Sequence, residues 1–296
     1  MTISASSIYL VGLQSERSKT VMESLLGRWT TILQGVGSHT ELDWTNITYP
    51  DILQGINTLK GEGKAPTTLN NYIAVIKGVS KEAWKLELLS TRQYTNIKDI
   101  KRVAGSRTNK GVLLSKEDLR RLISSCVEDN TVLGARDSAI IALSYGAGLR
   151  RSESASLSLQ DYNPSKQTVC MLGKGNKQMV NTLNDSTVEV VNNYLKVRGN
   201  KKGYLFLRGR RGNTLQEEGI TDQAIYNMIV ARCANLGLGK VSPHSLRKSF
   251  VTHLLENGED LFTVADLARH ADVSTTKGYD LRGDCVRVAA AKSLNF

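Results

Sequence analysis

The amino-acid sequence predicts a mostly α-helical protein of two domains: an N-terminal four-helix bundle, then an α-rich domain with one small antiparallel β-sheet. Three observations support this prediction. Apolar residues recur at three- and four-residue spacing through residues 15–103, the period of a helix packed on one side. Residues 104–111 then read AGSRTNKG and offer no apolar anchor. Beyond them, helical patterns flank short β-type runs, two of which are joined by a glycine-rich turn.

The first domain, residues 1–103, is expected to consist of four helices. The third is the clearest, because Pro66 stands at its start, where a residue without an N–H is tolerated. Helices of this number and length form a small bundle. The four segments span residues 18–34, 50–60, 67–89 and 91–103. The apolar stripe of the third comprises Leu69, Ile73, Ile76, Val79, Ala83 and Leu86.

Residues 104–111 are predicted to form a basic linker between the domains. Small and polar residues favour an extended, flexible chain, and this segment contains nothing else. Two roles for its charges, Arg107 and Lys110, stay open. They contact a phosphate backbone, or they are simply solvated.

The second domain, residues 112–296, is expected to begin at Ser115, an N-cap-like residue before the amphipathic LRRLISSC. The turn at 173–177 should join two strands into a hairpin. The predicted strands are residues 158–162, 168–172 and 178–183. Further helices are predicted at 136–145, 185–197, 221–236, 244–256, 260–268 and 285–294. The last is too short to be stable alone, so we expect it to dock on its own domain or on a neighbouring protomer.

The balance of charge favours nucleic acid as the partner. The chain carries 39 Lys and Arg against 28 Asp and Glu, a net charge of +11. Residues 1–110 hold 14 basic against 9 acidic residues, and the remainder holds 25 against 19. A basic tail would concentrate the excess at one end, whereas this even spread suits two domains that hold one polyanion.

Cysteine usage and hydropathy indicate a cytoplasmic protein. The four cysteines, Cys126, Cys170, Cys233 and Cys285, are far apart and never form a CxxC pair. This argues against a zinc site or a disulfide framework. The apolar run near the N-terminus is short and follows no basic residue, so we expect no signal peptide. No apolar stretch reaches 18 residues, so we expect no membrane partner.

Several short motifs carry residues suited to phosphate chemistry. In PHSLR, His244 and Arg247 are three apart and therefore share one face of a helix. The fork of an arginine matches phosphate oxygens, and an imidazole donates or transfers a proton. GLRRSE supplies Arg150, and LARH ends at His270, nine residues before Tyr279.

Together these motifs resemble the tyrosine recombinase, or phage integrase, family over residues 15–287. The compact length is similar to that of Xer-type chromosome-dimer resolvases and of plasmid or transposon resolvases. Any one anchor of the pattern is weak, because each also suits an ordinary structural role. Six of them in the expected order are a specific signal: Arg150, Lys174 in GKGNK, His244, Arg247, His270 and Tyr279.

The resemblance implies a site-specific recombinase that cuts and rejoins DNA strands without a metal, a cofactor or ATP. Tyr279 would attack the scissile phosphate, giving a 3′-phosphotyrosyl link and a free 5′-hydroxyl. Lys174 would act as the general acid that protonates the leaving oxygen. His244 would help remove the proton from Tyr279.

The resemblance also assigns the groups that meet the charge of the five-coordinate phosphorus. Without a metal ion, that charge requires fixed donors, and Arg150, Arg247 and His270 would supply them. Glu153, three residues after Arg150, is expected to orient neighbouring basic groups.

In this family four protomers act on two double-stranded DNA sites and exchange one strand of each at a time through a Holliday junction. We therefore expect DNA recombination sites as partners and self-association to a tetramer, with any accessory protein left undetermined. Further basic residues expected to contact DNA are Arg107, Lys110, Arg151, Lys177, Arg208, Arg210, Arg211 and Lys248.

The sequence departs from the family pattern beside two anchors. Arg269 stands where a glycine usually precedes His270, so its side chain either crowds the turn or adds a phosphate contact. Gly278 makes the segment before Tyr279 more flexible than a bulky apolar neighbour would.

Two rival functions compete with the recombinase. A type IB-like topoisomerase shares the nucleophile chemistry but relaxes DNA as a monomer, and the separate helical bundle disfavours it. A non-catalytic DNA-binding regulator of the same fold is disfavoured because every catalytic group is retained. Residue by residue, Arg150 and Arg151 could follow the end of a helix and complement its dipole, and Lys174 could be an ordinary turn lysine.

Overall fold

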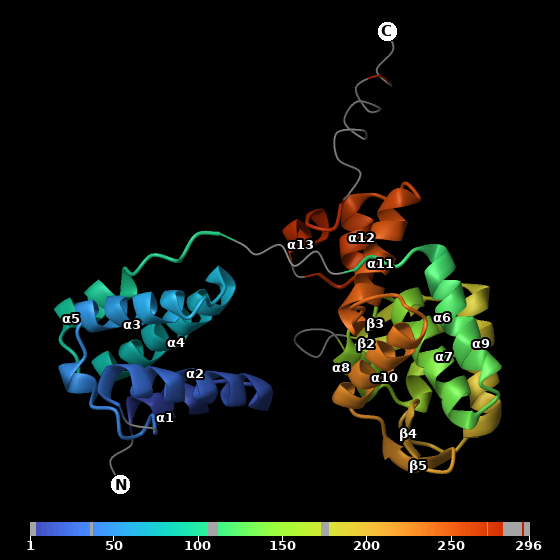
Figure 1. The fold of residues 1–296 in the computed structure, drawn as a ribbon, viewed down its shortest axis with the longest axis horizontal. Helices are drawn as coiled ribbons and strands as arrows, with labels where there is room; N and C mark the ends of the chain where they lie inside the picture. The colour runs from blue at the N-terminus through green and yellow to red at the C-terminus, as the bar shows by residue number, and fades with distance from the viewer. Residues whose placement is uncertain are drawn as a thin grey trace. The chain divides into compact units, whose positions relative to one another are not determined.

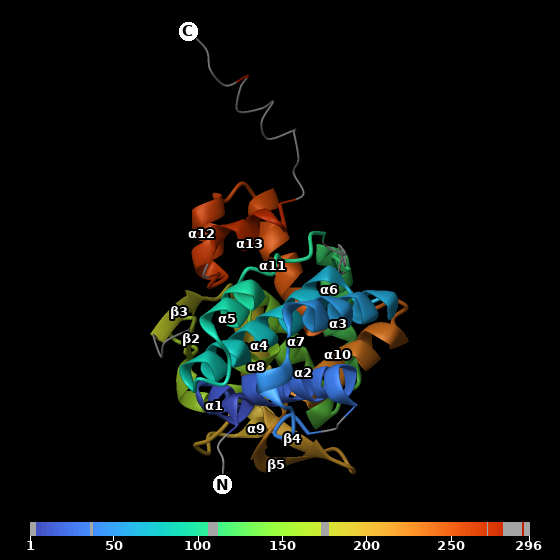
Figure 2. The same ribbon diagram turned by 90° about the vertical axis from the view of Figure 1, so that its left-hand side faces the viewer.

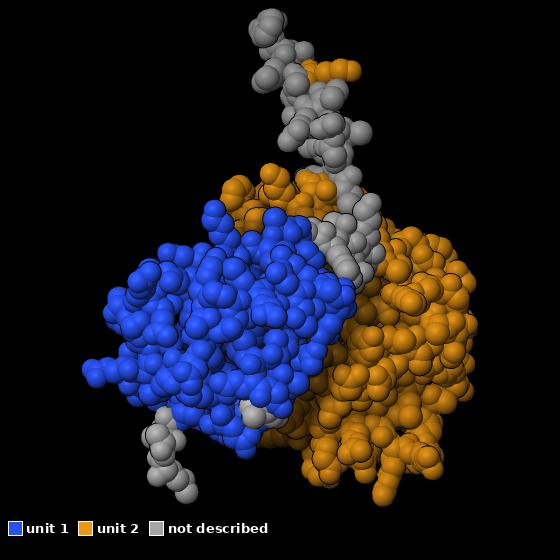
Figure 3. All heavy atoms as spheres, turned by 60° about the vertical axis from the view of Figure 1, so that its left-hand side comes forward, with its two compact units in different colours: residues 1–109 blue, residues 110–296 orange. Residues whose placement is uncertain are grey.

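The computed structural model describes residues 4–35, 38–105, 112–172, 178–270 and 272–280, together with Lys292. The chain divides into two compact units, residues 1–109 and residues 110–296 (Figure 3). Each unit has its own hydrophobic core. The predicted mostly helical fold class is confirmed.

Unit 1, residues 1–109, is helical throughout its described part (Figure 1). The predicted helices are found with shifted ends, and the predicted number of four is wrong because a further helix precedes them. The elements are α1 (Ala5–Val11), α2 (Glu16–Gln34), the 3-10 turn η1 (Trp44–Asn46), α3 (Tyr49–Gly61), α4 (Pro66–Lys85) and α5 (Thr91–Lys98).

The additional helix α1 is short and gives no periodic signal. Ser4 caps it by accepting a hydrogen bond from the backbone of Ser7. It packs on α4 at Gly78, where a Cβ atom would lie only 2.3 Å from the ring of Tyr9. Tertiary contact rather than intrinsic propensity therefore accounts for this helix.

Helix α4 is the centre of unit 1 and contacts the four other helices. Its predicted apolar stripe is buried with one exception. Leu86 is 40% exposed, since α4 ends one residue before it and the chain turns at Glu87, whose φ is +59°. Helix α5 also ends earlier than predicted. The chain after it is held against α4 by Asn70, which accepts from the Val103 N–H at 2.9 Å and donates to its carbonyl at 3.1 Å.

Unit 2, residues 110–296, is built around α7 (Figures 1 and 2). α7 (Val132–Gly146) is buried on nearly every side between α6 (Lys116–Glu128) and α9 (Asp185–Arg198). The other helical elements are α8 (Arg151–Ser156), η2 (Leu159–Asp161), α10 (Asp222–Asn235), α11 (Pro243–Glu256), α12 (Leu261–Leu267) and α13 (Val273–Lys277). Among these, α8 and α13 were not predicted, because neither is long enough to show a period.

The described residues of unit 2 form two small antiparallel sheets instead of the single one predicted. The first has the order β1-β2-β3, from β1 (Tyr162–Asn163), β2 (Thr168–Leu172) and β3 (Gln178–Thr182). The first predicted strand is wrong over most of its length, because residues 159–161 form η2. The second sheet is the hairpin of β4 (Leu207–Arg210) and β5 (Thr214–Gly219), which was missed. In both views, α12 and α13 lie at one end of unit 2 and this hairpin at the other (Figures 1 and 2).

Three predicted segments fall wholly or mainly outside the described residues: the linker at 104–111, the hairpin turn at 173–177 and the C-terminal helix at 285–294. No helix in the described part of the chain is both long and apolar enough to cross a membrane.

The packing of α3 on α2 yields a stability prediction. A Cβ on Gly55 would lie 2.5 Å from Cζ3 of Trp29, a ring that is fully buried and fixed by a hydrogen bond from its Nε1 to the Tyr72 carbonyl. We expect Gly55→Ala to lower the free energy of unfolding of unit 1 by about 1–3 kcal/mol, because the ring must shift. Tryptophan fluorescence in urea measures this directly, since the three tryptophans of the chain all lie in unit 1.

The matched control is Gly61→Ala at the end of the same helix. A Cβ on Gly61 would meet nothing within 4 Å, so this variant should be unchanged or up to about 1 kcal/mol more stable. Equal stability of the two variants would contradict the close approach of α2 and α3.

Candidate active site

Four separate elements of unit 2 bring the predicted residues together. Arg150 precedes α8, and His244 and Arg247 lie on the first turns of α11, which begins at a proline. His270 follows α12, and Tyr279 follows α13. The hydrogen bonds below connect these elements, so residues up to 129 positions apart meet in one place.

Arg150 is the N-cap of α8 and is held by Glu153. The Glu153 carboxylate accepts from the backbone N–H of Arg150 at 2.8 Å and from its Nη1 at 2.5 Å. Nη2 of Arg150 donates to the carbonyl of Arg269 at 3.0 Å. As the residue before α8, Arg150 stands where the dipole of that helix does not favour a cation, so its position there depends on Glu153.

Arg247 is buried and bonded to main chain. Its Nη1 donates to the carbonyl of Gly148 and its Nη2 to the carbonyl of Ala268. Burial, with the nearby charges of Arg150 and Arg269, lowers the pKa of Arg247 to about 10. The side chain thus joins the loop before Arg150 to the end of α12.

Tyr279 and His244 form the pair that the proposed proton transfer requires. The Tyr279 hydroxyl lies 2.9 Å from Nε2 of His244. Packing of the ring against the apolar cluster of α11 and α12 raises the pKa of Tyr279, and the charges of Arg247 and Arg150 oppose that rise. Although His244 is exposed, loss of solvation around its ring and the charge of Arg247 lower its pKa. A neutral His244 can accept a proton from the phenol.

His270 also contacts the tyrosine ring. The two rings are stacked, with centroids 5.9 Å apart and planes at 22°. Nδ1 of His270 is 2.7 Å from the hydroxyl of the fully buried Thr276. Burial and the charges of Arg247 and Arg150 lower the pKa of His270 to about 4. In the tautomer in which the Thr276 hydroxyl donates to Nδ1, a neutral His270 carries its proton on Nε2.

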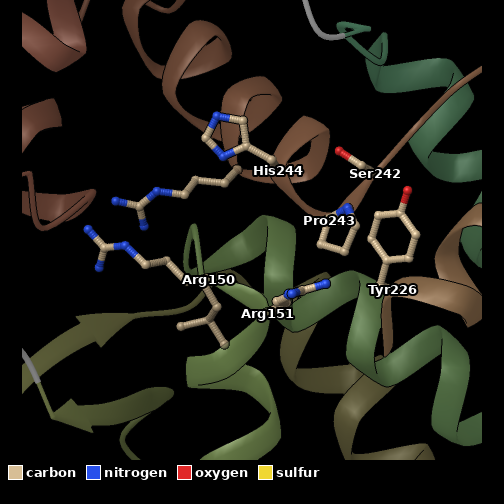
Figure 4. Close-up of a pocket in the computed structure, with 8 residues that line it drawn as sticks. Arg150, Arg151, Tyr226, Ser242, Pro243 and His244 are labelled. Carbon is tan, nitrogen blue, oxygen red and sulfur yellow. The ribbon is translucent and has the colours of Figure 1, made fainter. Parts of the chain in front are cut away.

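A pocket of about 290 Å³ opens beside these groups (Figure 4). Arg150 and His244 border it from different elements, and the guanidinium of Arg151 turns toward Tyr226 (Figure 4). Arg151 pairs with Asp222 at 3.2 Å and lies 5.7 Å from the centroid of the Tyr226 ring. The lining residues are Leu149, Arg150, Arg151, Tyr226, Ser242, Pro243, His244 and Arg247.

The electrostatics of the site favour an anion. Arg150, Arg247 and Arg269 gather around one carboxylate, Glu153. Burial alone would raise the pKa of Glu153, but the charge of Arg269 and the hydrogen bonds from Arg150 lower it below its usual range. The cluster therefore retains positive charge that a phosphate diester can neutralise. Within the described ranges, no three His, Cys, Asp or Glu side chains are grouped to hold a metal ion.

The remaining predicted residues divide into those that the structure describes and those that it does not. Lys174, Lys177, Arg107 and Lys110 lie outside the described residues. Lys248 follows Arg247 on α11 and is partly exposed.

Three predicted DNA contacts, Arg208, Arg210 and Arg211, lie on the β4–β5 hairpin and are exposed. This hairpin packs on the start of α7, where Gly209 approaches Leu133. The active-site loop follows the end of α7, and a helix of 15 residues spans roughly 22 Å. The structure thus separates the hairpin from the site.

Two residues of the site were missed as contributors. Arg269 does not line the pocket: its backbone adopts a φ of +56°, and its side chain is 2% exposed. The glycine usual at this position in the family was the signal that a left-handed backbone is required there. Asn181 on β3 donates to the carbonyls of Ala147 and Leu267, at 3.1 and 3.0 Å, and no sequence signal marks it.

Comparison with protein families gives one assignment. Residues 113–282 match the model of the phage integrase family. The tyrosine recombinase XerD of Oceanobacillus iheyensis is 30% identical over 261 residues, which cover 84% of this chain and 83% of that protein. The tyrosine recombinase XerD of Rickettsia prowazekii is 34% identical over 251 residues, which cover 79% of this chain and 78% of that protein.

Solved structures share the fold. An integrase of the Tn1549 transposon, in complex with transposon right-end DNA, has a TM-score of 0.74 at 16% identity, over 98% of this chain and 99% of that one. The XerH site-specific recombinase, in a post-cleavage complex with its palindromic difH substrate, has a TM-score of 0.72 at 22% identity. That match covers 94% of this chain and 80% of the other.

The lowered histidine pKa values predict that acid weakens the fold. In the folded protein the pKa values of His244, His253 and His270 all lie below the usual 6.5. As pH falls from 7 to 5, the unfolded chain therefore binds protons that the folded chain does not. Each such proton lowers the free energy of unfolding by at most about 1.4 kcal/mol per pH unit, and by less at the exposed His244, where solvent screens the shift.

Urea titrations followed by circular dichroism at pH 7 and pH 5, at fixed ionic strength, measure this loss. His270→Asn should lose less stability than the wild type over the same interval, because its most strongly shifted histidine is gone. Equal losses would show that protonation of His270 is not coupled to folding.

Proposed function

The chain belongs to the phage integrase family, and from this membership we propose that it is a Xer-like tyrosine recombinase that cuts and rejoins DNA at specific sites with Tyr279 as its nucleophile. One observation supports assigning these roles to individual residues: the Tyr279 hydroxyl lies 2.9 Å from Nε2 of His244, next to the arginine cluster. A nucleophile, a base and an anion site are thereby adjacent.

The cleavage step uses these groups in sequence. The Tyr279 oxygen attacks the phosphorus of the scissile diester, and its proton passes to Nε2 of His244. A bond forms between phosphorus and the tyrosine oxygen, and the bond from phosphorus to the 5′-oxygen breaks. Lys174 donates a proton to that oxygen, which leaves as a 5′-hydroxyl. The 3′-phosphotyrosyl link keeps the energy of the broken bond, so rejoining needs no ATP.

Positive groups stabilise the transition state. Arg150 is 46% exposed on its side chain and uses two of its hydrogen-bonding groups on Glu153 and the Arg269 carbonyl, which leaves others for phosphate oxygens. Arg247 borders the same pocket. In its neutral form His270 donates a hydrogen bond through Nε2. Together they meet the charge that builds on the non-bridging oxygens, and no metal is required.

The assembly proposed on DNA is the tetramer expected of the family. Two DNA sites are brought together by four protomers, and strands are exchanged in pairs through a Holliday junction. We assign unit 1 and the basic segment at 104–111 to holding the duplex beside unit 2, with the hairpin arginines and Lys248 as further contacts. The described cysteines are free thiols, which suits action in the reducing cytoplasm.

Tyr279→Phe tests the nucleophile. Removing one hydroxyl should abolish covalent attachment to a suicide substrate nicked beside the cut site, because no oxygen remains to attack phosphorus. Binding to the site should change little, since a single hydrogen bond contributes about 1 kcal/mol. Denaturing gels detect the DNA–protein adduct, and gel shifts measure binding. An adduct formed by the Phe variant would identify another residue as the nucleophile.

Lys174→Ala tests the general acid. Cleavage of a normal 5′-oxygen should slow by about 100- to 10,000-fold. A substrate with a bridging 5′-sulfur should be cleaved at nearly the wild-type rate, because a thiolate leaves without a proton. The control is Lys177→Ala, which removes a second lysine from the same predicted turn and should affect both substrates equally. If Lys174→Ala also slows both equally, Lys174 holds DNA and is not the acid.

A further inference from the structure

Arg269 occupies a position that is unfavourable for an arginine in three ways. Its φ of +56° is in the left-handed region, where a Cβ atom is sterically strained. Its guanidinium is buried, although Arg150 and Arg247 already place positive charge beside it. Its Nε has no hydrogen-bond partner among the described residues. A glycine would avoid all three costs, so the side chain needs a compensating function.

The contacts of the guanidinium converge on the segments that hold the phosphate-binding residues. Nη1 donates to the carbonyls of Ala147 at 3.1 Å and Leu267 at 3.0 Å. Nη2 donates to the carbonyl of Gly148 and to Glu153 Oε2, both at 2.9 Å. Arg269 therefore connects the loop before Arg150 with the end of α12.

Glu153 links Arg269 to Arg150 through hydrogen bonds to both residues. One carboxylate oxygen accepts from Nη2 of Arg269 and from the backbone of Arg150, and the other accepts from Nη1 of Arg150. The backbone carbonyl of Arg269 in turn accepts a hydrogen bond from Nη2 of Arg150 at 3.0 Å. Both terminal nitrogens of the Arg150 guanidinium are thus fixed through one residue.

The other contacts of Arg269 have a second donor. Asn181 also donates to the carbonyls of Ala147 and Leu267, and Arg247 also donates to that of Gly148. Loss of the Arg269 side chain leaves none of these three carbonyls without a donor. Glu153 alone loses a partner, so the effect should fall on Arg150 while the fold persists.

We propose that Arg269 is a positioning residue, which holds Glu153 so that Arg150 is oriented for the scissile phosphate before DNA binds, and which does not itself touch DNA. The proposal rests on the recombinase function assigned above. It predicts that Arg269 influences the rate of cleavage and not the affinity for DNA, and that its influence passes through Arg150.

Single-turnover cleavage of a suicide substrate at saturating protein tests the proposal. Arg269→Gly also relieves the strained φ, so it should fold. Its cleavage rate should fall by roughly 10- to 100-fold, as expected for a phosphate-binding group moved by about 1 Å, while the Kd for the site stays within about threefold. Arg269→Lys should not restore the rate, because an ammonium group cannot reproduce the planar fork.

A double-mutant cycle separates positioning from general stability. In an Arg150→Ala background, Arg269→Gly should cause no further slowing, because the group it orients is absent. The control for loss of a buried arginine is Arg198→Met at the end of α9, which removes hydrogen bonds to the carbonyls of Lys201 and Leu205 in the following segment, away from the site. This variant should be less stable and should cleave at the wild-type rate while folded.

The outcomes are distinct. If Arg269→Gly slows cleavage equally in the wild-type and Arg150→Ala backgrounds, or cleaves as fast as the wild type, the positioning role is wrong although the recombinase function stands. If the wild type itself forms no covalent adduct, the proposed function fails first. Weaker DNA binding by Arg269→Gly with an unchanged rate would overturn the proposal in favour of a DNA contact.

Discussion

The site depends on electrostatic repulsion among three arginine side chains, which the single carboxylate beside them neutralises only in part. Arg150, Arg247 and Arg269 surround a single carboxylate, and burial together with the neighbouring positive charges lowers the pKa values of Arg247 and His270. Backbone carbonyls from the loop before α8 and from the end of α12 hold the guanidinium groups in place. The cluster therefore keeps a net positive charge, and a bound DNA phosphate would relieve the electrostatic repulsion already present in the free protein.

Burial, together with the same repulsion, lowers the pKa values of the two histidines. In water an imidazole among cations would be partly protonated near neutral pH, but here His244 and His270 are kept neutral. In the proposed mechanism, neutrality allows His244 to act as a base toward Tyr279 and His270 to donate a hydrogen bond to the phosphate. The arginines therefore act on the chemistry twice, once on the phosphate and once by setting what the histidines can do.

The sequence predicts long helices and motif residues well, and contacts between distant segments poorly. The stripe of α4 and the PHSLR helix follow from local periodicity and capping, and both are present. Helix α1, the β4–β5 hairpin and α8 depend on packing that no local pattern encodes. The position of Arg269 was recognised as unusual, but its inward direction depends on carbonyls more than 120 residues away, those of Ala147 and Gly148.

The hydrogen bond between Tyr279 and His244 lies within one chain, as do the contacts of Arg150, Arg247 and His270. With Tyr279 as the proposed nucleophile, this arrangement would let a protomer cut the strand it holds with its own tyrosine. In an assembly of several copies, defects in two different residues would not complement each other between subunits. The order of strand cleavage would then depend on which subunit is active, and not on which subunit donates a residue to another.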